Sequence, residues 1–213
     1  MSGNAYGIAV DSRSNVWVTG SFLQYNVVEL SHNSGVARKL RIPGRALGIA
    51  FDPDDNLWVA DFQHTESNLI QFLAGSDYRE THRYSVKGSP FALAFDKSGN
   101  LWAAVAGCPR DRIAQLLKSS DYANEIAYPV SGRPYGVAVD ARGNVWAAVA
   151  SEPKSEVREF ARSAGYSQTL AFEIPGYSTF AVDSTGNVWV QSFDYVETDA
   201  LTGVRRYAAA WYR

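Results

Sequence analysis

Five side chains in this sequence have types and positions that could bind or transform a ligand. Asp61 and His64 both lie in DFQH, where a carboxylate and an imidazole could hold a metal ion or move a proton. Arg45, Arg133 and Tyr177 each directly follow a glycine, in GRAL, GRPY and GYST. Arginine favours anions, because its guanidinium is a planar fork of donors that matches two oxygens at once. Which chemistry is available depends on how the fold places these loops.

Other motifs with a defined chemistry are absent from the sequence. It contains no GxSxG, P-loop, GxGxxG or cysteine-based zinc spacing. The segment DPDDN at 52–56 begins like a calcium loop but lacks the glycine and the glutamate that such a loop needs further on. We therefore predict no catalytic residue, no bound metal and no cofactor.

The composition is that of an ordinary globular chain. Of its 213 residues 46% are hydrophobic, and 20 basic residues face 22 acidic ones, which gives a net charge of −2. This balance argues against a nucleic-acid partner. No apolar run is long enough to span a membrane, the amino terminus does not resemble a secretory signal, and the single Cys108 cannot form an internal disulfide. These features leave the cellular compartment open.

The elements that must position the candidate residues are repeated along the chain. Five segments align without gaps: YGIAVDSRSNVWV from Tyr6, LGIAFDPDDNLWV from Leu47, FALAFDKSGNLWA from Phe91, YGVAVDARGNVWA from Tyr135 and STFAVDSTGNVWV from Ser178. Their aspartates are Asp11, Asp52, Asp96, Asp140 and Asp183, and their tryptophans are Trp17, Trp58, Trp102, Trp146 and Trp189. A fixed period of this length is typical of solenoids and propellers.

Each repeat is predicted to form four strands. The first alternates large and small apolar residues, and the second is a continuous apolar run, as expected of a short strand covered on both faces. Between them, DxxGN predicts a turn with a positive φ at its fourth position, which the first two repeats fill with Ser14 and Asp55. The third and fourth strands follow, for example NLIQF from Asn68 and YRETHRYSV from Tyr78.

The predicted fold is an all-β, five-bladed β-propeller with four antiparallel strands per blade. It forms a single domain, residues 1–213, with blades at about 5–45, 46–88, 89–132, 133–176 and 177–213. A closed monomeric ring is expected, because an open array leaves two apolar faces in water. The tryptophans lie between apolar neighbours, which favours packing between blades over a sugar-binding role.

The string PYGVAVDARGNVWAA, residues 134–148, resembles NHL repeats and the related repeats of the streptogramin (virginiamycin B) lyases and gluconolactonase-like propellers. The resemblance implies the propeller fold. It does not select one function, since such propellers include enzymes, sensors and protein-binding or RNA-binding platforms. Streptogramin lyases use histidine, glutamate and magnesium on the channel-mouth loops. Here these loops hold one histidine, and Glu152 and Asp194 do not match in position.

In a propeller, the loops that follow second strands and those that precede first strands gather at one mouth of the central channel. Asp61, His64, Arg45, Arg133 and Tyr177 all belong to these loops. We therefore expect a non-enzymatic binding or scaffold module whose mouth takes a small anionic ligand or a protein. The alternative is a metal-dependent lyase or lactonase. A competing account of the arginines is that they pair with acids in neighbouring loops.

Overall fold

The fold consists almost entirely of β-strands. The computed structural model describes residues 3–22, 24–63, 67–151, 154–174, 178–183, 187–192, 194–195, 207–208 and 211–212. Within these ranges the helical elements are three single 3₁₀ turns, η1 (Ala74–Ser76), η2 (Lys118–Ser120) and η3 (Arg162–Ala164). The all-β prediction is confirmed.

The first four repeats each form one antiparallel sheet of four strands, paired in chain order as predicted. Sheet 1 contains β1 (Gly3–Val10), β2 (Val16–Phe22), β3 (Val27–Ser31) and β4 (Gly35–Leu40). Sheet 2 contains β5 (Arg45–Phe51), β6 (Leu57–Phe62), β7 (Ser67–Phe72) and β8 (Thr81–Val86). Sheet 3 contains β9 (Ser89–Phe95), β10 (Leu101–Ala106), β11 (Arg112–Leu116) and β12 (Glu125–Pro129). Sheet 4 contains β13 (Arg133–Val139), β14 (Val145–Ala150), β15 (Ser155–Phe160) and β16 (Gln168–Ile174).

The fifth repeat departs from the prediction. Its sheet, sheet 5, pairs β17 (Ser178–Val182) with β18 (Val188–Ser192), and β18 with β21 (Trp211–Tyr212). The segment YVETD from Tyr195 is at the position of the third strand in the repeat pattern, but Tyr195 lies in β19 (Asp194–Tyr195), which pairs with β20 (Tyr207–Ala208). The described residues of this repeat therefore do not form a fifth four-stranded sheet.

The turn between the first and second strands has the predicted form. Asp52 Oδ1 accepts backbone N–H groups from Asp54 at 3.0 Å and from Asn56 at 2.9 Å. The fourth turn position has a positive φ in four repeats, at Ser14, Asp55, Gly99 and Gly143. Serine and aspartate thus adopt the left-handed conformation that Gly99 and Gly143 adopt at lower cost.

Neighbouring sheets are joined by a tryptophan and a tyrosine. The ring of Trp58 in sheet 2 packs edge-on against Tyr122 of sheet 3, with 4.6 Å between the ring centroids. Two equivalent pairs, Trp17 with Tyr78 and Trp102 with Tyr166, join sheet 1 to sheet 2 and sheet 3 to sheet 4. Packing between sheets, rather than sugar binding, is therefore what these buried tryptophans do here.

In sheets 2 to 4 the fourth strands begin later than predicted, because the joining tyrosines lie before these strands rather than in them. Tyr78, Tyr122 and Tyr166 follow the 3₁₀ turns with positive φ, and the strands begin only at Thr81, Glu125 and Gln168. Sheet 1 differs, because a short turn at residues 32–34 connects β3 to β4 and supplies no tyrosine.

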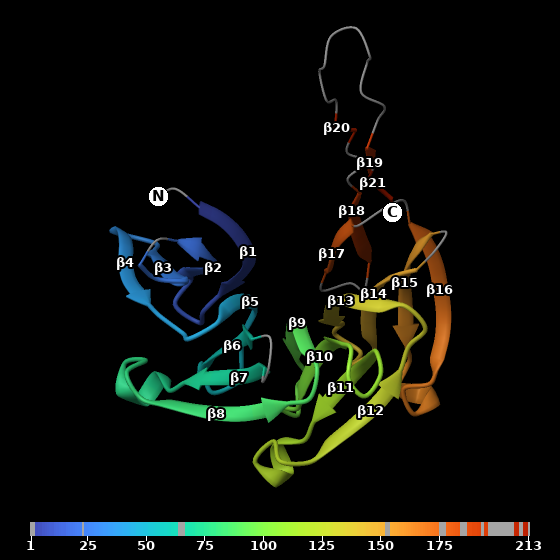
Figure 1. Cartoon of the computed structure of the whole chain (residues 1–213), viewed down its shortest axis with the longest axis horizontal. Helices are drawn as coiled ribbons and strands as arrows, with labels where there is room; N and C mark the ends of the chain where they lie inside the picture. The colour runs from blue at the N-terminus through green and yellow to red at the C-terminus, as the bar shows by residue number, and fades with distance from the viewer. Residues whose placement is uncertain are drawn as a thin grey trace, which may run out of the picture.

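The first strands of the sheets lie side by side around a central axis. Small residues in these strands allow the close approach: a Cβ on Gly48 would come within 2.8 Å of the backbone of Ala92 in the next sheet. Figure 1 shows β5, β9 and β13 next to one another at the centre of an arc, with β1 and β17 on the two sides of its opening.

The described residues of the first and fifth repeats do not form the expected seal. Ile8 in β1 is 70% exposed, whereas Ile49, at the same step of sheet 2, is 7% exposed. Val10 is 57% exposed, and Trp189 of sheet 5 is 40% exposed while Trp17, Trp58 and Trp102 are fully buried. The face of sheet 1 that would receive a preceding sheet therefore meets solvent.

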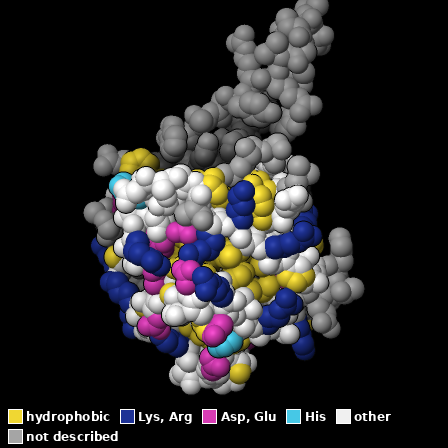
Figure 2. Space-filling model, turned by 90° about the vertical axis from the view of Figure 1, so that its left-hand side faces the viewer, with side chains coloured by type: hydrophobic (Ala, Val, Ile, Leu, Met, Phe, Trp, Pro, Cys, Tyr) yellow, Lys and Arg dark blue, Asp and Glu magenta, His cyan; other side chains and the backbone are white. Residues whose placement is uncertain are grey.

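The surface carries charges of both signs. Figure 2 shows basic and acidic side chains intermixed on one face of the molecule, with hydrophobic side chains between them. This face shows no large patch of one sign, in line with the net charge of −2. None of the described residues belongs to a helix that could cross a lipid bilayer.

Candidate functional site

The described candidate residues lie at one end of the sheets, as expected, but Arg45, Asp61 and Arg133 belong to the ends of strands rather than to loops. In sheet 2, Arg45 at the start of β5 pairs with Phe62 at the end of β6. In sheet 4, Arg133 at the start of β13 pairs with Ala150 at the end of β14. The first strands run in the same direction around the axis, so both arginines lie at the same mouth, opposite the aspartate turns.

A pocket with a volume of about 250 Å³ lies between the first strands. Every residue that lines it belongs to β1, β5, β9, β13 or β17, so we call it the channel pocket. Tyr6, Ile8, Phe91 and Tyr135 are among its larger side chains. In the described part of the chain its lining includes no Asp, Glu, His, Lys or Arg. The tyrosine hydroxyls are its ionisable groups.

Arg45 stacks on aromatic rings at the mouth of this pocket. Its guanidinium carbon lies 5.4 Å from the centre of the Tyr6 ring and 5.9 Å from that of Phe62. Its Nη2 donates to the Tyr6 hydroxyl at 3.4 Å. Hydrogen bonds from Ser21 and from Arg45 lower the pKa of Tyr6. Arg45 therefore helps to position the tyrosine of the neighbouring sheet.

Arg133 is held in the same way but has no polar partner in the described residues. Its guanidinium carbon lies 4.6 Å from the centre of the Phe91 ring, also from the neighbouring sheet. The Arg133 side chain is exposed, and it makes no hydrogen bond or ion pair to a described residue. Stacking uses the face of the guanidinium and leaves its N–H edges available.

Asp61 does not face the opening. It is fully buried, and its Oδ1 accepts the backbone N–H of Gly44 while its Oδ2 accepts Nε2 of Gln63, both at 2.7 Å. This carboxylate holds the loop that precedes Arg45, which is a structural role. Two other candidates, His64 and Tyr177, lie outside the described residues.

Two further arginines lie at this end, and sequence reasoning placed them only as parts of third strands. Arg112 is buried, pairs with Glu125 and donates to the backbone carbonyl of Lys87 at 2.8 Å. Arg158 is buried, pairs with Glu156 and donates to the carbonyl of Ser131 at 2.9 Å. The available signal was an acidic residue nearby in sequence, as in Glu156-Val-Arg158.

The site has no ready-made metal centre in the ranges described. No group of three or more His, Cys, Asp or Glu side chains comes close enough to hold an ion there.

Comparison with known proteins identifies the fold. No protein-family model matches the sequence, and no curated protein matches it. Among solved structures, virginiamycin B lyase from Staphylococcus aureus superposes with a TM-score of 0.67 at 12% identity, over 87% of this chain and 62% of that one. The fold is that of the β-propellers.

Other propellers superpose equally well. A gluconolactonase from Xanthomonas campestris gives a TM-score of 0.67 at 16% identity, over 87% of this chain and 68% of that one. A protein of unknown function from Bacteroides caccae gives 0.68 at 11% identity, over 90% and 71%. The resemblance to the streptogramin lyase and gluconolactonase propellers is thus confirmed for the fold. This chain spans only 62% of the virginiamycin B lyase chain.

Proposed function

We propose that this chain is a five-bladed, NHL-type propeller that acts as a binding module, and that its channel mouth takes a small anionic ligand or an acidic segment of a protein. One observation carries the proposal. Arg133 is fixed on the ring of Phe91 at the mouth and has no acid partner among the described residues. A guanidinium that is positioned but unpaired is suited to bind a carboxylate or phosphate.

The structural arginines of the same mouth support this interpretation by contrast. Arg112 and Arg158 are buried, and each is paired with a glutamate. The alternative is that Arg45 and Arg133 also pair with neighbouring acidic residues. Among the described residues, neither arginine forms such an ion pair. Both instead stack on aromatic rings of the neighbouring sheet.

A metal-dependent lyase or lactonase is the other function considered. The structural neighbours include a lyase and a gluconolactonase, at 12% and 16% sequence identity. At such low identity, structural similarity supports the fold alone. An enzyme of this kind needs several ionisable or metal-binding groups at the mouth, whereas the described lining of the channel pocket offers tyrosine hydroxyls. These observations favour the binding module.

The test is calorimetric titration of the protein with succinate and with inorganic phosphate at two salt concentrations. We expect saturable binding that weakens at higher salt, because exposed charges are screened. The double variant Arg45→Ala, Arg133→Ala should lose it. The matched control is Arg83→Ala, Arg142→Ala, which removes two exposed arginines of other surfaces and changes the net charge equally. Identical titrations in both double variants would contradict the proposal.

A further inference from the structure

The channel pocket has the size and lining to hold an apolar group. Its volume is about 250 Å³. A protein cavity of roughly 150 Å³ accommodates benzene. The channel pocket therefore has room for one six-membered ring with a short attached chain, and apolar side chains such as Ile49, Leu93 and Val137 form much of its wall.

The charge next to this pocket is positive and lies at the mouth. Two of the rings on which the arginines stack, Tyr6 and Phe91, themselves line the channel pocket. Each guanidinium is thus one aromatic ring away from the cavity. A ligand that filled the pocket would extend its polar end toward these groups.

The two arginines are not equivalent. Arg45 donates to the hydroxyl of Tyr6, so part of its hydrogen-bonding capacity serves the protein. Arg133 makes no such bond to a described residue. The anionic end of a ligand therefore has its better partner at Arg133, on the side of the pocket formed by β9 and β13.

We propose that the channel pocket binds an amphipathic carboxylate, with a ring-sized apolar body between the first strands and the carboxylate on Arg133. This inference rests on the proposed anion-binding function and narrows it to one class of ligand. The apolar body provides affinity through burial, and the guanidinium fixes its orientation.

The experiment compares three probes by calorimetry with the wild-type protein: 3-phenylpropanoate, acetate, and the neutral 3-phenylpropan-1-ol. We expect 3-phenylpropanoate to bind at least about tenfold more tightly than either of the others, because only it presents both the ring and the charge. Arg133→Ala should weaken the binding of 3-phenylpropanoate by about tenfold or more and leave the binding of the alcohol unchanged. Arg45→Ala should have the smaller effect.

A second pair of variants tests the location of the ring. Ile8 lines the channel pocket and is 70% exposed, whereas Val10 lies two residues further along β1, is 57% exposed and does not line the pocket. Ile8→Glu should abolish 3-phenylpropanoate binding, while Val10→Glu, which adds the same charge to the same strand, should preserve it. Melting temperatures of both variants show that each is folded.

The outcomes separate this inference from the proposed function. If 3-phenylpropanoate binds no better than acetate, and both depend on Arg133, the anion site stands and the amphipathic ligand is wrong. Equal loss of binding in Ile8→Glu and Val10→Glu would also contradict the pocket as the site. If no anion binds to the wild-type protein, the proposed function itself fails.

Discussion

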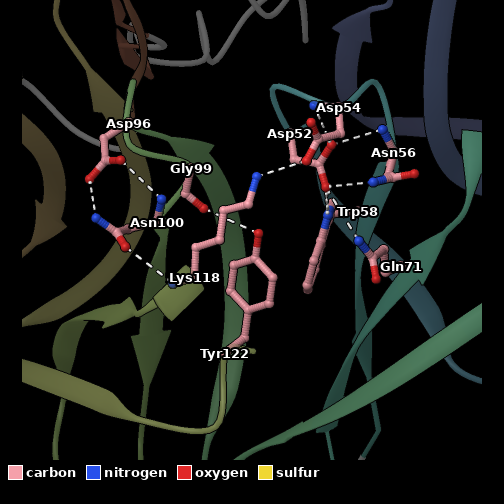
Figure 3. A network of polar contacts seen from close by, with 10 residues as sticks. All are labelled: Asp52, Asp54, Asn56, Trp58, Gln71, Asp96, Gly99, Asn100, Lys118 and Tyr122. Atoms are coloured by element: carbon pink, nitrogen blue, oxygen red, sulfur yellow. Dashed lines mark hydrogen bonds and ion pairs between the residues drawn. The ribbon is translucent and has the colours of Figure 1, made fainter. Parts of the chain in front are cut away.

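The indole nitrogen of Trp58 donates a hydrogen bond to Oδ2 of Asp52 at 2.9 Å. The same pair recurs in the other four repeats at 3.1 to 3.3 Å. In Figure 3 the carboxylate of Asp52 also accepts from Asn56 and from Gln71 of the third strand. One aspartate thus links the turn, the second strand and the third strand, while the ring of Trp58 packs edge-on against Tyr122 of the next sheet.

Removing this carboxylate should be costly. Asp52→Ala leaves the N–H groups of Asp54, Asn56, Trp58 and Gln71 without their acceptor, and we expect a loss of about 2 to 4 kcal/mol in the free energy of unfolding. Asp54→Ala is the control in the same turn, because the side chain of Asp54 forms an exposed ion pair with Lys118. Urea unfolding measures both; equal midpoints for the two variants would refute the role of Asp52.

Trp102→Ala should lower the free energy of unfolding by about 3 to 5 kcal/mol, since Trp102 is fully buried against Tyr128 and Tyr166. Trp189→Ala, at the same step of sheet 5, should cost clearly less because that side chain is 40% exposed. Chemical unfolding gives both values. A well-folded Trp102→Ala protein that had lost carbohydrate binding would restore the sugar-binding interpretation.

The open face of sheet 1 can be tested in solution with a matched pair. Ile49→Ala should destabilise the protein by about 2 to 4 kcal/mol because Ile49 is packed between sheets. Ile8→Ala should change stability by no more than about 0.5 kcal/mol, because Ile8 meets solvent. Comparable losses would show that the ring closes in solution, as the sequence predicted, and light scattering would then tell whether closure needs a second copy.

Replacing the carboxyl group of Glu29 in sheet 1 should stabilise the protein by an amount that depends on pH. It takes the place that Gln71 holds in sheet 2, its Oε2 is buried without a hydrogen-bond partner in the described residues, and Arg38 Nε lies 3.6 Å away. Burial raises the pKa of Glu29; Arg38 opposes this, and the nearby Asp11 carboxylate adds to it. Because the folded-state pKa lies above the ordinary value of 4.5, ionisation of Glu29 disfavours the folded state as the pH rises through that range.

Glu29→Gln should therefore raise the urea midpoint at neutral pH. The gain should shrink as the pH falls toward 4.5 and below, where Glu29 is protonated in both states and no penalty remains. A variant that was less stable than wild type at pH 7, or a difference that did not depend on pH, would contradict this account.

Local patterns predicted the fold well where each repeat determines its own structure. The Asp and Gly positions of the turn, including the unusual Ser14 and Asp55, follow from backbone conformation alone, so they are readable in one repeat. The Trp58 to Asp52 bond was missed although its signal, a tryptophan six residues after each turn aspartate, was present in every copy. Its geometry emerges only when the second strand folds back beside the turn.

Interactions between repeats were less predictable. That Tyr78 is a joining residue rather than a strand residue depends on a positive φ after a 3₁₀ turn, which no strand pattern encodes. Likewise, Asp61 looked like a mouth residue because its loop lies there, but the direction of its side chain is set by the backbone of Gly44 from another loop. For Arg133, the sequence predicted the position at the channel mouth correctly but could not show that its guanidinium stacks on the ring of Phe91.

No sheet of the described residues covers the exposed face of β1, so we expect the free energy of local opening to differ along the chain. When packed sheets open locally, an inner sheet must break its interfaces with two neighbouring sheets, whereas a terminal sheet must break only one. Backbone amides in β1 should therefore exchange hydrogen with solvent sooner than those in β10 or β11. Tyr6 and Ile8 of this strand also form one wall of the channel pocket. A ligand bound in the pocket would therefore stabilise β1 against local opening. Its binding would be seen as slower hydrogen exchange of the β1 amides.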